Sequence, residues 1–217
     1  MSKLIDLSHT VEHGMITYKG LPAPVISDYL SREDSKTRYA PGTEFHIGKI
    51  EMVANTGTYL DSPFHRYARG KDLAGLDLNS IANLDAVVVR CSQTEIDEQV
   101  FSSIDVKDKA VLVQTGWDKH WRTDEYSSGN HPFLTEGAAT HLAKNAAALV
   151  GIDSFNIDAT RDGNRPVHTI LLGHDIPIVE HLRGLGELPD RGFKFFAVPV
   201  KVRQFGTFPV RAFGITD

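Results

Sequence analysis

Cysteine is scarce in this sequence: Cys91 is the only one among 217 residues. A disulfide within the chain is therefore excluded, as is the class of small secreted domains that depend on disulfides. Because Cys91 lies at the end of a strand-like segment that contains the apolar run 86–89, we expect a buried structural thiol rather than a nucleophile. A single cysteine is typical of a reducing compartment.

Long hydrophobic runs and an excess of basic residues are also lacking. No stretch approaches the roughly 18 apolar residues of a spanning helix, and the first residues enter a strand pattern without the apolar core of a signal peptide. The net charge of −5 gives no basic footprint for nucleic acid. Neither glycine-rich phosphate loop, G-x-G-x-x-G or G-x-x-x-x-G-K-[ST], occurs. We expect a cytoplasmic protein with no membrane or nucleic-acid partner.

The composition that is present favours a folded domain, with 41% hydrophobic and 24% charged residues. We expect one domain over residues 1–217, of α/β or α+β class, with a mixed sheet. Residues 12–43 are irregular and predict a loop or lid. Strands are expected at 4–8, 45–54, 85–90, 110–114, 149–153, 193–200 and 209–215. Helices are expected at 93–101, 136–148 (with Thr135 as N-cap), 166–172 and 178–182.

The most informative stretch is residues 55–65, which reads Asn-Thr-Gly-Thr-Tyr-Leu-Asp-Ser-Pro-Phe-His. It follows an expected strand, and such junctions carry reactive side chains on a rigid scaffold. Gly57 permits a positive φ, and Pro63 stiffens the segment between Asp61 and His65. The alternative is a tight turn in which the aspartate caps its own backbone and the histidine lies on the surface.

Further candidates are His168, Glu180, and Asp118 with Trp117 and Trp121. A histidine and two carboxylates from separate segments suit a catalytic divalent ion, which lowers the pKa of water and polarises a carbonyl. Another histidine would then move protons. Taken singly, His168 and Glu180 also fit solvent-facing helix positions. We expect His174 and His181 on the surface, and the two tryptophans fit the core as well as a substrate platform.

Residues 55–65 resemble the signature His-x-Gly-Thr-His-x-Asp-x-Pro-x-His of the cyclase family of metal-dependent hydrolases, which includes bacterial kynurenine formamidases and isatin hydrolases. The resemblance extends along nearly the whole chain. The matching positions are Gly57, Thr58, Asp61, Pro63 and His65, with further matches at 6–8, 115–118, 151–153, 167–180 and 209–212.

The resemblance implies an arylformamidase-like hydrolase of a small amide, formamide, lactam or lactone, acting through metal-activated water. It also implies a swivelling β/β/α fold, a small-molecule substrate, and a homodimer or homotetramer. By position, Asp61, His168 and Glu180 would bind zinc or manganese, and His65 would be the general acid/base. Glu180 and Tyr59 also count among the predicted catalytic residues, and Thr58 and Trp117 among those predicted to bind substrate.

The chain departs from the signature at two metal-ligand histidines, where it has Asn55 and Tyr59. The remaining set of Asp61, Glu180, His168 and Asn55 is rich in oxygen, which favours manganese or magnesium over zinc. His46 could supply a nitrogen, although in a regular strand it would face away from Asn55.

Three functions stay open at this point. The first is the metal-dependent hydrolase. The second is a metal-independent hydrolase, in which His65 and Asp61 activate water while Tyr59 and Thr58 hold the oxyanion. The third is a pseudoenzyme that binds a small ligand. Residues 12–43 and 117–131 are expected to shape the pocket.

Overall fold

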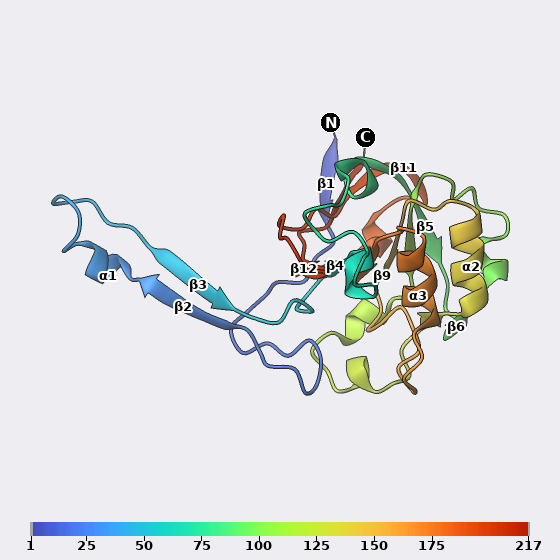
Figure 1. Cartoon of the computed structure of the whole chain (residues 1–217), viewed down its shortest axis with the longest axis horizontal. Coiled ribbons are helices and arrows are strands. Elements are labelled where there is room, and N and C mark those ends of the chain that lie inside the picture. The colour runs from blue at the N-terminus through green and yellow to red at the C-terminus, as the bar shows by residue number, and fades with distance from the viewer. Residues whose placement is uncertain (1, 217) are drawn as a thin grey trace.

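The computed structural model describes residues 2–216, and its main feature is a mixed, strongly curled sheet of nine strands (Figure 1). The strand order is β1-β13-β11-β5-β7-β9-β10-β4-β12. The predicted α/β class and mixed sheet are confirmed, whereas the swivelling β/β/α arrangement stays a prediction. In sheet order the strands are β1 (Lys3–Asp6), β13 (Phe213–Thr216), β11 (Arg191–Phe196), β5 (Leu84–Arg90), β7 (Ala110–Gln114), β9 (Leu149–Ile152), β10 (Ile178–Glu180), β4 (Tyr59–Asp61) and β12 (Thr207–Pro209).

The four central strands β5, β7, β9 and β10 are parallel, and their side chains alternate between two hydrophobic cores. In β7, for example, Ala110 and Leu112 point into the core inside the curl, while Val111 and Val113 point towards the helices. Strands buried on both faces read as continuous apolar runs, which is why the valine-rich segments could be recognised from the sequence.

Helices α2 (Glu136–Lys144) and α3 (Pro166–Gly173) lie side by side on one face of the sheet (Figure 1). Thr135 is the N-cap of α2 as predicted, since its hydroxyl accepts from the backbone N–H of Ala138 at 3.2 Å. The helix predicted at 178–182 is wrong, because Ile178–Glu180 form the buried strand β10. The helix predicted at 93–101 is replaced by the short strand β6 (Glu95–Ile96), which pairs with β8 (Phe133–Leu134), and the 3₁₀ turn η3 (Glu98–Phe101).

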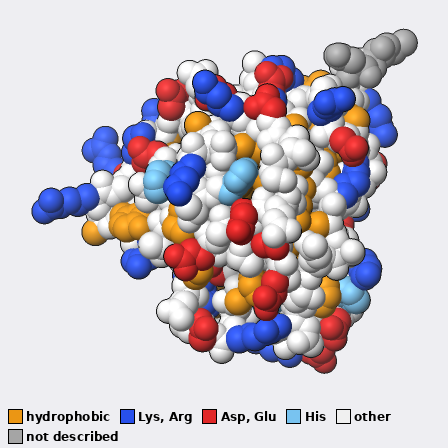
Figure 2. Space-filling model, turned by 90° about the vertical axis from the view of Figure 1, so that its right-hand side faces the viewer, with side chains coloured by type: hydrophobic (Ala, Val, Ile, Leu, Met, Phe, Trp, Pro, Cys, Tyr) orange, Lys and Arg blue, Asp and Glu red, His pale blue; other side chains and the backbone are white. Residues whose placement is uncertain are grey.

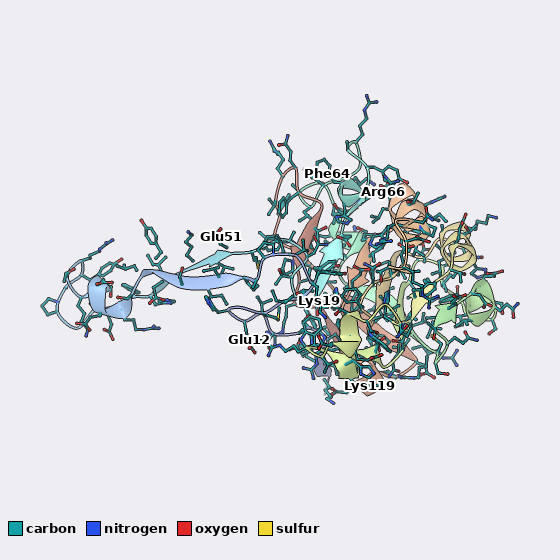
Figure 3. The ribbon with its side chains drawn as sticks, turned by 90° about the horizontal axis from the view of Figure 1, so that it is seen from below. Glu12, Lys19, Glu51, Phe64, Arg66 and Lys119 are labelled. Atoms are coloured by element: carbon teal, nitrogen blue, oxygen red, sulfur yellow. The ribbon has the colours of Figure 1, made fainter. Side chains whose placement is uncertain are left out.

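The prediction of a loop at 12–43 is wrong in part, because much of this segment belongs to a long two-stranded arm. The arm consists of β2 (Val25–Leu30), the short helix α1 (Arg32–Ser35) and β3 (Ile47–Glu51), and it projects from the body (Figures 1 and 3). The strand expected at 45–54 therefore exists, but it pairs with β2 and not with the main sheet. None of the described helices is long and apolar enough to span a membrane.

Candidate active site

The segment around residues 55–65 forms β4 and the turn that follows it. Gly57 has a φ of 65°, and a Cβ there would lie 3.1 Å from a methyl group of Val11, so this glycine suits a tight turn. Strand β4 pairs with β10 on one side and β12 on the other, which sets Tyr59 opposite Glu180 and Asp61 opposite Thr207. The register therefore gathers four polar side chains inside an apolar sheet.

The 3₁₀ turn η1 (Pro63–His65) brings His65 back towards Asp61. The proline occupies the first position of the turn, and the N–H of His65 donates to the carbonyl of Ser62 at 2.9 Å. Arg66 then reaches from the turn to Thr169 on α3, with Nε 3.2 Å from Oγ1, and Figure 3 shows the labelled turn beside that helix. Strand β4 and turn η1 thereby hold the side chains of Asp61 and His65 next to each other.

Asp61, His65 and His168 each offer a ligand atom, and these atoms lie within 4.8 Å of one another. Asp61 is fully buried, yet its Oδ2 has no hydrogen-bond partner. That oxygen lies 3.7 Å from Nε2 of His168, and Oε1 of Glu180 lies 3.8 Å from the same nitrogen. These distances are too long for hydrogen bonds and leave room between the three side chains.

Asp158 fixes the orientation of His168 at the start of α3. Its carboxylate accepts from the backbone N–H groups of Val167 and His168 and lies 2.6 Å from Nδ1 of the ring. Burial alone would lower the pKa of His168, but the hydrogen bond to Asp158 and the negative charges of Glu180 and Asp61 raise it to about 10. With Nδ1 committed to Asp158, Nε2 is the ring atom that faces Asp61 and Glu180.

Thr207 on β12 joins Asp61 to His65. Its hydroxyl donates to Oδ1 of Asp61 and lies 2.7 Å from Nδ1 of His65. His65 is exposed, with 36% of its side chain accessible, so its ring meets both the buried carboxylate and the open cavity. The geometry thus leaves Nε2 of His65 for a group that enters from solvent.

Glu180 is held by two donors on the other side of the site. The hydroxyl of Tyr59 donates to Oε2 at 2.5 Å, and the N–H of Ile157 donates to Oε1 at 2.6 Å. Burial is the main cause that raises the pKa of Glu180 and of Tyr59, each above its ordinary value. Tyr18 adds a second phenol, 2.7 Å from the hydroxyl of Tyr59. Two protonated phenols therefore stand beside one buried carboxyl group.

These groups border a cavity of about 1090 Å³ that is lined by Asn55, Tyr59, His65, His168 and Glu180 among others. All five were predicted as site residues from the sequence, and the cavity brings them together; their roles stay predictions. Comparison with known proteins gives the family. The family model described as "Putative cyclase" matches residues 5–159, more than half of the chain. The chain belongs to the cyclase family.

Relatives of this cyclase-family chain match over nearly its full length. A kynurenine formamidase from Bacillus cytotoxicus is 28% identical and covers 97% of this chain and 96% of its own. Isatin hydrolase A from Labrenzia aggregata has the same fold, with a TM-score of 0.83 at 19% identity over 99% of this chain and 94% of that one. A structure described as a potential metal-dependent hydrolase with cyclase activity gives 0.79 at 22% identity, over 100% and 99%.

The two residues predicted to bind substrate, Thr58 and Trp117, lie outside the cavity lining. The hydroxyl of Thr58 donates to the carbonyl of His181 at 2.6 Å and accepts from the N–H of His9 at 3.0 Å. The indole N–H of Trp117 donates to the carbonyl of Tyr126 at 3.1 Å. Both side chains thus hold neighbouring segments of this cyclase fold together, and their substrate-binding role stays a prediction.

Four other expectations are settled by position. His46 lies on the arm with Nε2 2.7 Å from Asp28, so it does not replace a ligand. His181 was expected on the surface, but it is fully buried, with Nδ1 2.8 Å from the hydroxyl of Tyr126. His174 is exposed as predicted. Cys91 is half-buried, and burial raises the pKa of its thiol to about 11, which disfavours a nucleophile.

Sequence reasoning missed Tyr18, Asp158 and Thr207. Tyr18 and Asp158 lie in loops without periodicity, and Thr207 opens a strand of only three residues. The one signal within the sequence was chemical: a metal-ligand histidine needs a carboxylate or carbonyl behind it. That rule calls for a residue such as Asp158 without saying where in the chain it is.

Proposed function

We propose that this chain is a metal-dependent hydrolase that cleaves a C–N bond of a small formamide, amide or lactam, or the C–O bond of a lactone. Arylformamidase-like activity is the first chemistry to test, because relatives 24–28% identical over most of the chain carry the name kynurenine formamidase. The isatin hydrolases of similar fold support the same reaction type on a cyclic amide.

The observation that carries the proposal is the unpartnered Oδ2 of buried Asp61, 3.7 Å from Nε2 of His168. A buried carboxylate oxygen without a partner is costly unless a cation completes it. The donors present fit a divalent ion: Asp61, His168 and Glu180 would hold it, with Asn55 at the cavity wall. We propose manganese or zinc, with magnesium as a further option, since the set is rich in oxygen.

A divalent ion would supply Lewis acidity towards the substrate carbonyl. The chain itself supplies the proton transfer. His65 is fixed through Nδ1 by Thr207, and no hydrogen bond among the described residues occupies its Nε2. It can take a proton from water and return it to the leaving nitrogen or oxygen, the usual task of a general acid/base. Tyr59 and Tyr18 hold Glu180 in place, which we propose as their role.

A metal-independent hydrolase is the second candidate, and the bridge from Asp61 through Thr207 to His65 favours it. In that reaction the carboxylate, hydroxyl and imidazole would activate water without an ion. Tyr59 fits less well as its oxyanion donor, because its hydroxyl already donates to Glu180. The ligand-binding pseudoenzyme is the remaining possibility from a different class.

One experiment separates the three. Protein purified without chelator or histidine tag is analysed for metal by mass spectrometry, and N-formylkynurenine, isatin and a simple aryl lactone are assayed before and after chelation. We expect near-stoichiometric manganese or zinc and turnover that chelation abolishes and the metal restores. Turnover that survives in metal-free protein would establish the second candidate. Binding without turnover of any of these compounds, with or without added metal, would establish the third.

A further inference from the structure

Two arginines, Arg66 and Arg165, line the active-site cavity, and they differ in how their guanidinium groups are used. Nη1 of Arg165 donates to three backbone carbonyls of the loop before α3, at 2.6 to 3.1 Å. Arg66 uses only its Nε, and among residues 2–216 neither of its terminal nitrogens has a hydrogen-bond or ion-pair partner. The terminal nitrogens of Arg66 are therefore available to a group that enters the cavity.

The side chain of Arg66 is held in place although it is exposed. Its Nε donates to Oγ1 of Thr169 on α3 at 3.2 Å, and its guanidinium carbon lies over the ring of Tyr67, 5.4 Å from the ring centre. The hydroxyl of Tyr67 donates in turn to the carbonyl of Thr169 at 2.7 Å. Figure 3 shows the labelled arginine beside this helix. The planar group is thus oriented before any ligand binds, which lowers the entropy lost on binding.

Arg66 and its anchor Thr169 each follow a histidine of the site directly in the sequence. Arg66 is the residue after His65, and Thr169 is the residue after His168. The two imidazole rings have their centroids 5.9 Å apart. A ligand that places a carbonyl group at His65 therefore needs only a short extension to reach the guanidinium of Arg66.

Two parallel N–H donors of a guanidinium match the two oxygens of a carboxylate. Arg165 adds positive charge to the same wall of the cavity, because it lies four residues before Thr169 and the N–H of Thr169 donates to its carbonyl at 3.0 Å. The chain as a whole carries a net charge of −5. On the face that carries α2, acidic and basic side chains are interspersed (Figure 2), so no broad basic patch on that face competes for an anion.

We propose that Arg66 selects the substrate, by binding through its two terminal nitrogens a carboxylate that lies a few bonds from the scissile carbonyl. The preferred substrate is then an anionic formamide, amide, lactam or lactone. A neutral analogue forfeits the two charged hydrogen bonds, which is the physical basis of the selection. The inference rests on the proposed function for the type of reaction only, since the binding of a carboxylate at Arg66 needs no turnover.

Binding is measured by calorimetry on the full chain as purified, with two ketones that a hydrolase does not cleave. The ketones are 3-acetylbenzoate and acetophenone, which differ only in the carboxylate. We expect the wild type to bind the acid at least roughly tenfold more tightly, the scale of a hydrogen bond to a charged group. Arg66→Gln keeps a donor for Thr169 and removes the charge, so it should abolish this preference by weakening only the acid. Arg69→Ala is the control, because Arg69 is exposed in the same segment but outside the cavity lining.

Equal affinity of the wild type for the two ketones would overturn the proposal. An acid affinity that is unchanged in Arg66→Gln would overturn it too, and would show that the carboxylate binds elsewhere, for example to a metal ion. The cleavable pair 3-formamidobenzoate and formanilide is assayed in parallel, and Arg66→Gln is expected to lose the preference for the acid in kcat/KM. A wild type that cleaves neither formamide would count against the hydrolase, whereas the ketone affinities would still decide the role of Arg66.

Discussion

Asp61 differs from the other buried aspartates in how its oxygens are used. Asp158 accepts three hydrogen bonds from α3, and Asp153 accepts three from Thr115 and Gly116. Among the five unpartnered buried side-chain atoms of the described residues, Oδ2 of Asp61 is the only carboxylate oxygen. A buried carboxylate with an oxygen that lacks a hydrogen-bond partner is a candidate metal ligand. A buried carboxylate whose two oxygens both accept hydrogen bonds is structural.

His65 gives the most direct residue-scale test of the reaction. His65→Ala is expected to lower kcat/KM at least roughly a hundredfold on any confirmed substrate, the usual scale for loss of an acid/base group. The fold should persist, because the ring is exposed and its only side-chain hydrogen bond among the described residues is to Thr207. Exposed His174→Ala serves as the control. Equal activity of the two variants would remove His65 from the mechanism.

Asn55 and Tyr59 test whether the altered signature positions face the metal. The double variant Asn55→His/Tyr59→His adds two nitrogen donors, and nitrogen favours zinc. Zinc affinity, measured by competition with a chelating dye, is expected to rise at least about tenfold, or 1.4 kcal/mol. Tyr59→Phe with Asn55 unchanged removes the same hydroxyl without adding nitrogen and should show no such gain. If both variants bind zinc alike, these positions do not contribute ligands.

The candidate site was predictable where its residues share one short segment or a recognisable chemistry. Asp61 and His65 are four residues apart in one segment. His168 and Glu180 lie far from that segment in the sequence, but a histidine and a carboxylate are the residue types that a divalent ion needs. Tyr18 could not be found, because it reaches Glu180 from a loop more than 160 residues away in sequence. His181 was misjudged since it continues a strand whose two faces are both buried.

At the scale of elements, Gly206 sets the distance between the β11–β12 connection and turn η1. A Cβ at this position would lie 2.5 Å from the backbone N and 2.6 Å from the Cα of His65. Gly206→Ala must therefore displace the turn, and we expect kcat/KM to fall about tenfold or more, since small misplacements of catalytic groups are costly. Gly186→Ala, where the nearest atom is a flexible side-chain amide 3.1 Å away, is the control. Unchanged activity of Gly206→Ala would show that the turn tolerates the shift.

Elements were predictable to the extent that their local pattern was unambiguous. The valine runs of β5 and β7 and the capped helix α2 carry clear signals. Strand β10 was mistaken for a helix because it has only three residues, Ile178–Glu180, which are too few to show whether the hydrophobic pattern repeats with the period of a strand or of a helix. The arm was missed in part because its strands expose apolar and polar residues alike, so no alternation of the two marks them as strands.

For the whole molecule, acid stability depends on histidines buried in the neutral form. Burial, with smaller effects of Arg183 and Arg122, lowers the pKa of His9 to about 4, and its ring stacks on Trp121 at 3.9 Å. The unfolded chain takes up a proton near pH 6.5, so stability should fall as pH drops from about 6.5 to 4. His9→Phe keeps the stacking and should show a smaller fall in melting temperature across this window. His174→Gln should follow the wild type; equal slopes for His9→Phe and wild type would contradict the prediction.

Metal binding should stabilise the whole fold, because the proposed ligands join β4, α3 and β10. At a metal concentration 100 times the dissociation constant the gain is about 2.7 kcal/mol. At about 2–4 °C per kcal/mol for a chain of this size, we expect the melting temperature to rise by about 5–10 °C. Asp61→Asn should abolish the rise. Asp158→Asn should only shift it to roughly 10–100-fold higher metal concentration, because Asp158 orients His168 without offering a free oxygen. If neither manganese nor zinc changes the melting temperature of the wild type, no metal binds the unpartnered oxygen of Asp61. The functional partners of the Asp61 side chain would then be Thr207 and His65.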